Sequence, residues 1–133
     1  MLLLATLLVT SALSVGCVRA RPLETWATQC APGSYAPQSL DRWFRLTSDV
    51  IPGRRGPHVE GYVYNDFGVG AERMRLAVDR VDGADRTVDC VTISVPGAVP
   101  PAGRAYFTAD VPDASARYRV RILSFDWANK GGP

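Results

Sequence analysis

The feature that most constrains the fold is an alternation of polar and apolar residues with a period of two, which recurs from about residue 42 onward. It is clearest in HVEGYVYND, residues 58–66, where Val59, Gly61 and Val63 take every second position. Successive side chains of a β-strand point to opposite faces of the sheet. The alternation therefore predicts a strand with one buried and one solvated face, as in antiparallel sheets.

Five further segments are expected to form strands. Two of them, AERMRLAVDRV (71–81) and RTVDCVTISV (86–95), flank an Asp-Gly pair at Asp82, which is a strong hairpin signal because glycine accepts positive φ. The other three cover residues 42–51, 105–111 and 117–127. About six or seven short strands with frequent turn signals and no long helical pattern predict an all-β fold, an immunoglobulin-like antiparallel β-sandwich.

The start of the chain resembles an export signal. An uncharged apolar core of about fourteen residues begins at Leu2, too short for a membrane span of about 20 residues. The Gly-Cys pair ending at Cys17 resembles the lipobox of lipoproteins, with Ser14 where leucine is usual. We expect a signal peptide over residues 1–16 and a lipid anchor on Cys17. The alternatives are simple cleavage after Ala20, giving a soluble periplasmic or secreted protein, and a retained anchor.

After the signal, the composition divides the chain. Proline and glycine recur in residues 17–39, which predicts a tether, although Trp26 and Tyr35 suggest that it packs on the domain. The sandwich domain is expected over residues 40–128, followed by a flexible tail at 129–133.

Cys30 and Cys90 are the two cysteines left once Cys17 is lipidated or removed. In an oxidising compartment an even number favours a disulfide, and a loop of about 60 residues makes it worth about 4 kcal/mol in the chain-entropy model. Two separate thiols are the alternative. The single histidine, His58, lies far from both cysteines in sequence, so we expect no metal site and no cofactor.

Arginines at alternate positions form a candidate binding surface. Arg117, Arg119 and Arg121 share one strand face, and Arg73 and Arg75 form a neighbouring row. Guanidinium groups suit phosphate and carboxylate. The rows predict either an anion-binding patch or a solvated sheet face with carboxylate partners across the strands.

Aromatic residues form a second candidate surface, made of Tyr62 and Tyr64 with Phe125 and Trp127. Tyrosine and tryptophan are common at interfaces because they combine a large area with a polar tip. The alternative is that these rings cover a sheet edge or pack beneath a loop.

Four aspartates, Asp79, Asp82, Asp85 and Asp89, cluster around the predicted hairpin. They suggest either a calcium site, although the EF-hand order of acids is absent, or a polar hairpin tip. In the second interpretation Asp79 points outward on its strand.

One tyrosine has a structural signature. The stretch DASARYRV, residues 113–120, resembles a tyrosine corner, in which a hydroxyl bonds the backbone a few residues upstream at a sandwich turn. Tyr118 is the residue concerned.

The strand and turn residues together resemble the FxLYD-type immunoglobulin-like domains of bacterial and archaeal envelope proteins, over residues 41–127. The matches are a Gly-x-Val-x-Asn strand, an Asp-Gly turn and a Pro/Gly loop before a Phe-bearing strand: Gly61, Val63, Asn65, Asp82, Gly83, Pro101, Gly103 and Phe107. The Phe-x-Leu-Tyr-Asp signature is replaced by residues 78–82, which share only its aspartate. The resemblance implies a binding or structural domain and no catalytic residues.

Composition limits the function. A net charge of +2 gives no sign of nucleic-acid binding. The chain has no nucleophile elbow, Gly-rich phosphate loop or metal-ligand spacing, so we expect no enzyme. The expected function is that of a non-catalytic envelope lipoprotein, held at the membrane by its anchor, whose domain is an accessory module for an envelope protein partner. The alternative is a soluble periplasmic or secreted binder of an anionic glycan or lipid through the arginine rows.

Overall fold

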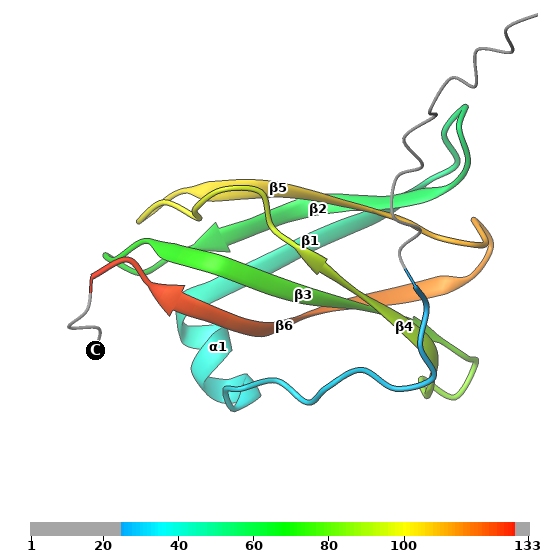
Figure 1. Ribbon diagram of the computed structural model, residues 1–133, viewed down its shortest axis with the longest axis horizontal. Coiled ribbons are helices and arrows are strands. Elements are labelled where there is room, and N and C mark those ends of the chain that lie inside the picture. The colour runs from blue at the N-terminus through cyan, green and yellow to red at the C-terminus, as the bar shows by residue number, and fades with distance from the viewer. Residues whose placement is uncertain (1–24, 130–133) are drawn as a thin grey trace, which may run out of the picture.

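The computed structural model describes residues 25–129 (Figure 1). A short helix and six strands follow one another: α1 (Pro37–Trp43), β1 (Phe44–Ile51), β2 (His58–Asn65), β3 (Ala71–Val81), β4 (Thr87–Ser94), β5 (Arg104–Asp110) and β6 (Arg117–Trp127). The strands lie where the alternation predicted them, except that β1 begins at Phe44 because the helix continues to Trp43. Proline at position 37 suits the first turn of a helix, where its missing N–H costs nothing.

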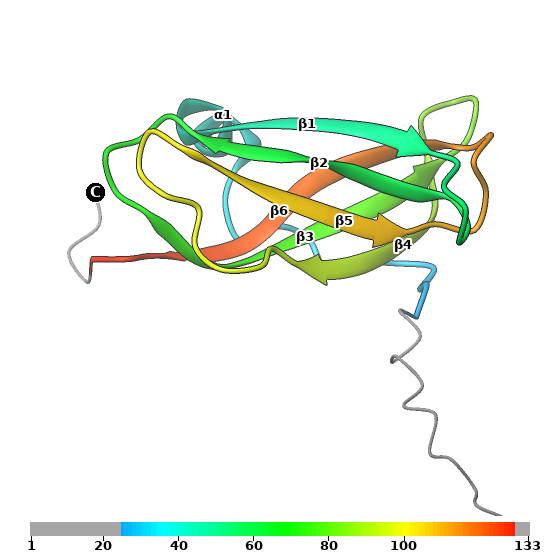
Figure 2. The same cartoon turned by 90° about the horizontal axis from the view of Figure 1, so that it is seen from above.

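The six strands form two antiparallel three-stranded sheets, ordered β1-β2-β5 and β4-β3-β6. Figures 1 and 2 show them as two layers, with the chain passing from one layer to the other between β2 and β3, β4 and β5, and β5 and β6. This is an all-β sandwich, as the sequence predicted.

The core lies between the two sheets. Val59 and Val63 are almost fully buried, as the alternation in β2 required, and they meet side chains such as Leu76 and Val78 from the other sheet. Gly61 shares their face, and a Cβ atom there would lie 1.8 Å from the backbone oxygen of Thr47. The close approach of β1 therefore requires glycine at this position.

Aromatic side chains close one end of the sandwich. The Phe125 ring lies 4.9 Å from that of Phe44, 4.8 Å from that of Trp127 and 4.7 Å from that of Tyr35, measured between centroids. Phe125 is buried and Trp127 is half-buried. The two residues thus pack beneath the helix and its preceding segment, which was the second of the two interpretations of this aromatic pair.

Residues 25–36 form a segment that we call the strap, which crosses the outer face of the β4-β3-β6 sheet. Ala27 exchanges two backbone hydrogen bonds with Cys90 on the free edge of β4, each 2.8 Å long, and the Sγ atoms of Cys30 and Cys90 are bonded. At the other edge, Ser34 donates its N–H to the oxygen of Leu123 in β6. Figure 1 shows the strap passing from β4 to α1. The predicted tether therefore lies on the domain over its described residues.

Tyr118 forms the tyrosine corner that the sequence predicted. Its hydroxyl donates to the backbone oxygen of Asp113 at 2.7 Å and accepts the N–H of the same residue at 3.3 Å. Partial burial raises the pKa of Tyr118, so the phenol stays protonated and keeps donating. The corner fixes the turn that carries the chain from β5 into β6.

Several predictions fall on residues that the structure does not describe. They are the signal peptide over residues 1–16, the lipid site Cys17, the rival cleavage site at Ala20 and the tail from residue 130. Within residues 25–129, no helix has the length and apolar character that crossing a bilayer requires.

The disulfide is expected to contribute a large share of the stability of the fold. It closes a loop across a sequence separation of 60 residues, and the double variant Cys30→Ser/Cys90→Ser should lose about 4 kcal/mol in free energy of unfolding. Urea denaturation measures this loss. As a control, reductant should destabilise the wild type and leave the double variant unchanged. Equal denaturation midpoints for the wild type and the double variant without reductant would contradict the prediction.

Candidate functional site

The arginine row of β6 is largely neutralised by carboxylates. Arg121 binds Asp79 at 2.8 Å and Arg119 approaches the same carboxylate at 3.8 Å. Arg117 pairs with Asp85 in the β3–β4 turn. These partners lie across the strands, as the second interpretation of the rows required, although the part of the face that holds Asp79 is not solvated. Two carboxylates thus serve three arginines, and the row keeps at most one uncompensated positive charge, at the half-exposed Arg119, for an anionic ligand.

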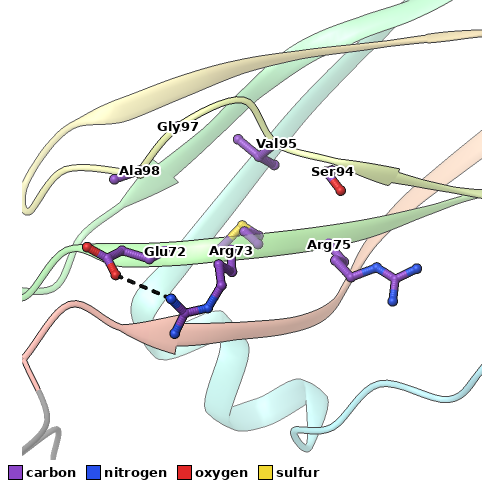
Figure 3. A pocket seen from close by; sticks show the side chains of 8 residues that line it. Glu72, Arg73, Arg75, Ser94, Val95, Gly97 and Ala98 are labelled. Atoms are coloured by element: carbon purple, nitrogen blue, oxygen red, sulfur yellow. Dashed lines mark ion pairs between the residues drawn. The ribbon is translucent and has the colours of Figure 1, made fainter.

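Arg73 and Arg75 lie beside a shallow hollow of about 520 Å³ between β3 and the segment that follows β4. Figure 3 shows their guanidinium groups well apart, with Arg73 turned toward Glu72 and Arg75 extending along β3. Arg73 is paired with Asp126 at 2.7 Å, whereas Arg75 has no carboxylate partner among residues 25–129. A single unpaired guanidinium beside an exposed hollow is too little to form a specific anion-binding site.

Asp79 points outward from its strand, as predicted, but it is buried. Its side chain does leave the core side of β3, but the strap covers that face, and the residue is only 1% exposed. The Oδ2 atom pairs with Arg121 and Arg119, while the buried Oδ1 atom has no hydrogen-bond partner.

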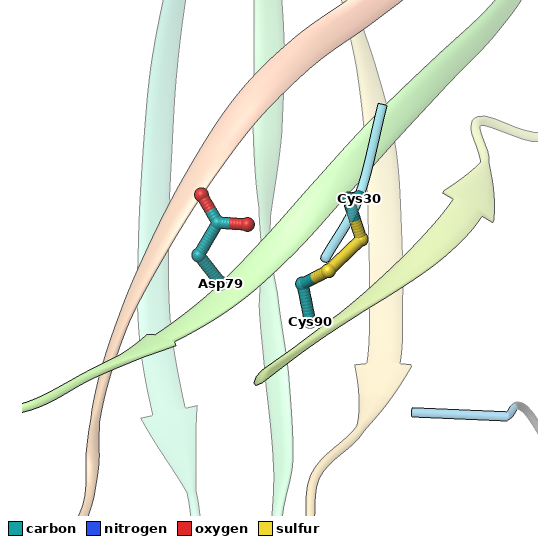
Figure 4. A group of neighbouring side chains, drawn as sticks. All are labelled: Cys30, Asp79 and Cys90. Atoms are coloured by element: carbon teal, nitrogen blue, oxygen red, sulfur yellow. A yellow bond between two sulfur atoms is a disulfide. The ribbon is translucent and has the colours of Figure 1, made fainter. Parts of the chain in front are cut away.

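The same carboxylate lies next to the disulfide (Figure 4). One carboxylate oxygen of Asp79 and the sulfur atoms of Cys30 and Cys90 lie within 4.8 Å of one another. Because the two sulfurs are bonded to each other, they are not thiolate ligands in this state. The disulfide therefore attaches the strap to β4, next to the ion pair between Asp79 and Arg121.

The other three aspartates of the predicted hairpin also have partners. Asp89 holds Arg80 through two hydrogen bonds of 2.8 and 2.6 Å. Asp82 accepts the backbone N–H groups of Arg86 and Ala84, which lower its pKa and close the turn. These contacts favour the polar hairpin tip over a calcium site.

The outer face of the β1-β2-β5 sheet carries three tyrosines and two arginines, which we call the tyrosine face: Tyr62, Tyr64, Tyr106, Arg45 and Arg104. Tyr62 lies opposite Tyr106 in the strand register, with ring centroids 5.7 Å apart. Tyr64 lies 6.1 Å from Tyr62. The Cζ atom of Arg104 stands 4.2 Å above the Tyr62 ring, and that of Arg45 stands 4.8 Å above the Tyr64 ring.

The charges on this face are only partly compensated. Arg45 forms two hydrogen bonds with Asp66, which lower the pKa of that carboxyl. Tyr106, 44% exposed, donates its hydroxyl to Glu60 at 2.7 Å, and this bond raises the pKa of the phenol. Arg104 has no carboxylate partner in the described part of the chain. The face therefore presents three phenols around a guanidinium that contacts Tyr62 and Tyr64 but has no carboxylate partner among the described residues.

Sequence reasoning found Tyr62 and Tyr64 but missed the other members of the tyrosine face. Tyr106 stands at an outward position of a predicted strand, so alternation alone marks it as exposed. Its pairing with Tyr62 depends on which strands are neighbours. The structure also separates these tyrosines from the arginine rows, which lie on the outer face of the opposite sheet.

A larger concavity than the hollow beside Arg73 lies between the free edges of β1 and β6, and we call it the edge groove. It has a volume of about 900 Å³, and the strap and α1 form part of its wall. Its lining combines residues of the strap, helix and both strands: Pro32, Gly33, Tyr35, Pro37, Leu40, Asp41, Phe44, Arg45, Leu46, Thr47, Val120, Arg121 and Ile122.

Comparisons with known proteins give no match for this chain among protein-family models, curated proteins or solved structures.

Removing the buried carboxylate tests its role under the strap. Asp79→Ala should lower the free energy of unfolding by about 2–3 kcal/mol, because the half-buried Arg121 loses a fully buried partner. The matched control is Asp126→Ala, which breaks an exposed pair with Arg73 and should cost less than about 1 kcal/mol. Urea unfolding of both variants measures the difference, and equal losses would show that burial of Asp79 is irrelevant.

Proposed function

We propose that this chain is a non-catalytic envelope protein, exported and held at the membrane by lipid on Cys17, whose β-sandwich binds a protein partner through the tyrosine face. The resemblance to FxLYD-type domains belongs to the same proposal. The observation that carries it is the outward cluster of three tyrosines with stacked guanidinium groups on one sheet.

Export is supported by the cysteine chemistry. Cys90 is fully buried and bonded to Cys30, and this bond joins the strap to the domain. Structural disulfides persist in oxidising compartments and are rare in the cytosol of mesophiles. The apolar start of the chain and the Gly-Cys pair ending at Cys17 agree with that location.

Binding at the tyrosine face is supported by its composition and rigidity. Tyrosine and arginine are enriched among residues that dominate binding energy, because they bury a large area and also form hydrogen bonds. Ring contacts and cation–π pairs already hold Tyr62 and Tyr64 in place, so little side-chain entropy is lost on binding. The guanidinium of Arg104 has no carboxylate partner among the described residues, so it suits a binding partner with a carboxylate opposite it.

The alternative of an anionic glycan or lipid binder draws on the arginine rows. Four of those five arginines lie within ion-pair distance of a carboxylate, although Arg119 and Arg121 share Asp79, and Arg75 has no such partner in the described part of the rows. The tyrosine face therefore has the stronger support.

The anchor is tested by fractionating cells that express the wild type or Cys17→Ser. We expect the wild type in the membrane fraction with the mass of a lipidated chain, and the variant in the soluble exported fraction or unprocessed. Equal solubility and unmodified mass in both would contradict lipidation and leave simple cleavage after Ala20.

The binding face is tested with the double variant Tyr62→Ser/Tyr106→Ser. Loss of two central aromatic contacts should weaken capture of the partner from envelope extracts by about tenfold or more. Arg73→Ser is the matched control, because it removes an exposed side chain from the opposite sheet. Quantitative cross-linking to the folded proteins measures capture; equal loss or no loss in both variants would contradict the proposal.

A further inference from the structure

The free edge of β6 has backbone groups available for pairing. The backbone N–H and C=O of Cys90 bond Ala27 and so point away from β3. Asp79 lies opposite Cys90 in the register, so the backbone groups of Asp79 point away from β4, toward β6. Asp79 lies opposite Arg119, whose backbone groups therefore face β3. By alternation, the groups of Val120 and Ile122 face the edge groove.

The edge of β1 offers the same chemistry from the other sheet. Phe44 donates its N–H to the oxygen of Leu40 in α1, away from β2. Alternation then turns the backbone groups of Leu46 and Ser48 in the same direction. Neither edge pairs with a further strand among residues 25–129. The strap covers the end of β6, where Ser34 bonds Leu123 and a Cβ atom on Gly33 would lie 3.1 Å from the oxygen of Ile122, so Val120 and the N–H of Ile122 are the groups left open there.

The floor of the edge groove is apolar. Leu46 and Val120 are half-buried and pack against the core, and Ile122 is buried. Two unpaired strand edges above an apolar floor match an extended polypeptide, which supplies backbone donors and acceptors and places every second side chain on the floor. A glycan has no regular alternation of backbone amide donors and carbonyl acceptors to pair with the strand edges.

The charges at the edge groove favour a nearly neutral occupant. Arg45 and Arg121 contribute to its wall, but both are already paired with carboxylates. Asp41 is exposed and has no ion-pair partner in the described chain. The groove therefore offers no unpaired positive charge to an anionic ligand. The carboxylate of Asp41 favours a ligand with a basic residue at the end that lies near α1.

We propose that the edge groove binds an extended segment of a partner polypeptide, which adds as a strand to the free edge of β6 and places alternate apolar side chains between the two sheets. The strap and α1 wall the groove, so an unfolded segment enters it more readily than the edge of a second folded copy. This site is separate from the tyrosine face and goes beyond the function proposed above.

The experiment screens a displayed library of random nonapeptides against the mature protein. Enriched peptides should alternate apolar residues and carry a basic residue near one end. Val120→Lys places a charge on the floor and should weaken binding by about tenfold or more. Val88→Lys is the matched control, because it makes the same change at an exposed site on β4 and should leave binding unchanged.

Two further measurements do not depend on how well Val120→Lys folds. N-methylation of the peptide at one alternate set of residues should abolish binding, while methylation of the other set is tolerated, because only one set faces β6. Bound peptide should also slow amide hydrogen exchange at Val120 and Ile122. The variant Asp41→Lys should reverse the preference for a basic end.

The proposal is overturned if no alternating peptide is enriched, if both methylated sets bind equally, or if the amides protected on binding lie elsewhere than in β6 and β1. It is also overturned if Val120→Lys blocks a self-association seen by sedimentation, since the occupant is then a second copy. The variant Tyr62→Ser/Tyr106→Ser should bind the peptides normally, so failure at one site is distinguishable from failure at the other.

Discussion

The strap is fixed to the sandwich at both edges of one sheet, and much of the surface chemistry follows from this. The disulfide and the Ala27 pairing attach it to β4, and the bond from Ser34 attaches it to β6. Between these points it converts an outer sheet face into an interior. The edge strand β4, otherwise open to association with other strands, is also partly covered by the strap.

The main consequence of this coverage is the buried ion pair. Asp79 would be an ordinary solvated carboxylate on a bare sheet, but under the strap it needs Arg121, and Arg121 in turn donates to the backbone oxygen of Ala31 in the strap. Charge is thus used to join the strap to β6, and the arginine row is committed to that structure.

The two surfaces left for binding differ in kind. The tyrosine face is flat, rigid and rich in side chains, which suits a folded protein surface. The edge groove is recessed and lined by unpaired backbone, which suits an extended chain. Together the two proposals give a module that contacts one partner on its sheet and takes up a segment along its edge.

The sequence by itself determined the strands, the Asp-Gly hairpin, the buried face of β2 and the corner at Tyr118, because each depends on residues close together in the chain. It also named the two cysteines that are joined. Only the tertiary structure decided that Asp79 is buried, that Tyr106 and Arg104 join Tyr62, and that the edges of β1 and β6 face a common groove. These depend on strand order and on the path of the strap. Alternation says which side chains leave a sheet, but not what lies above them.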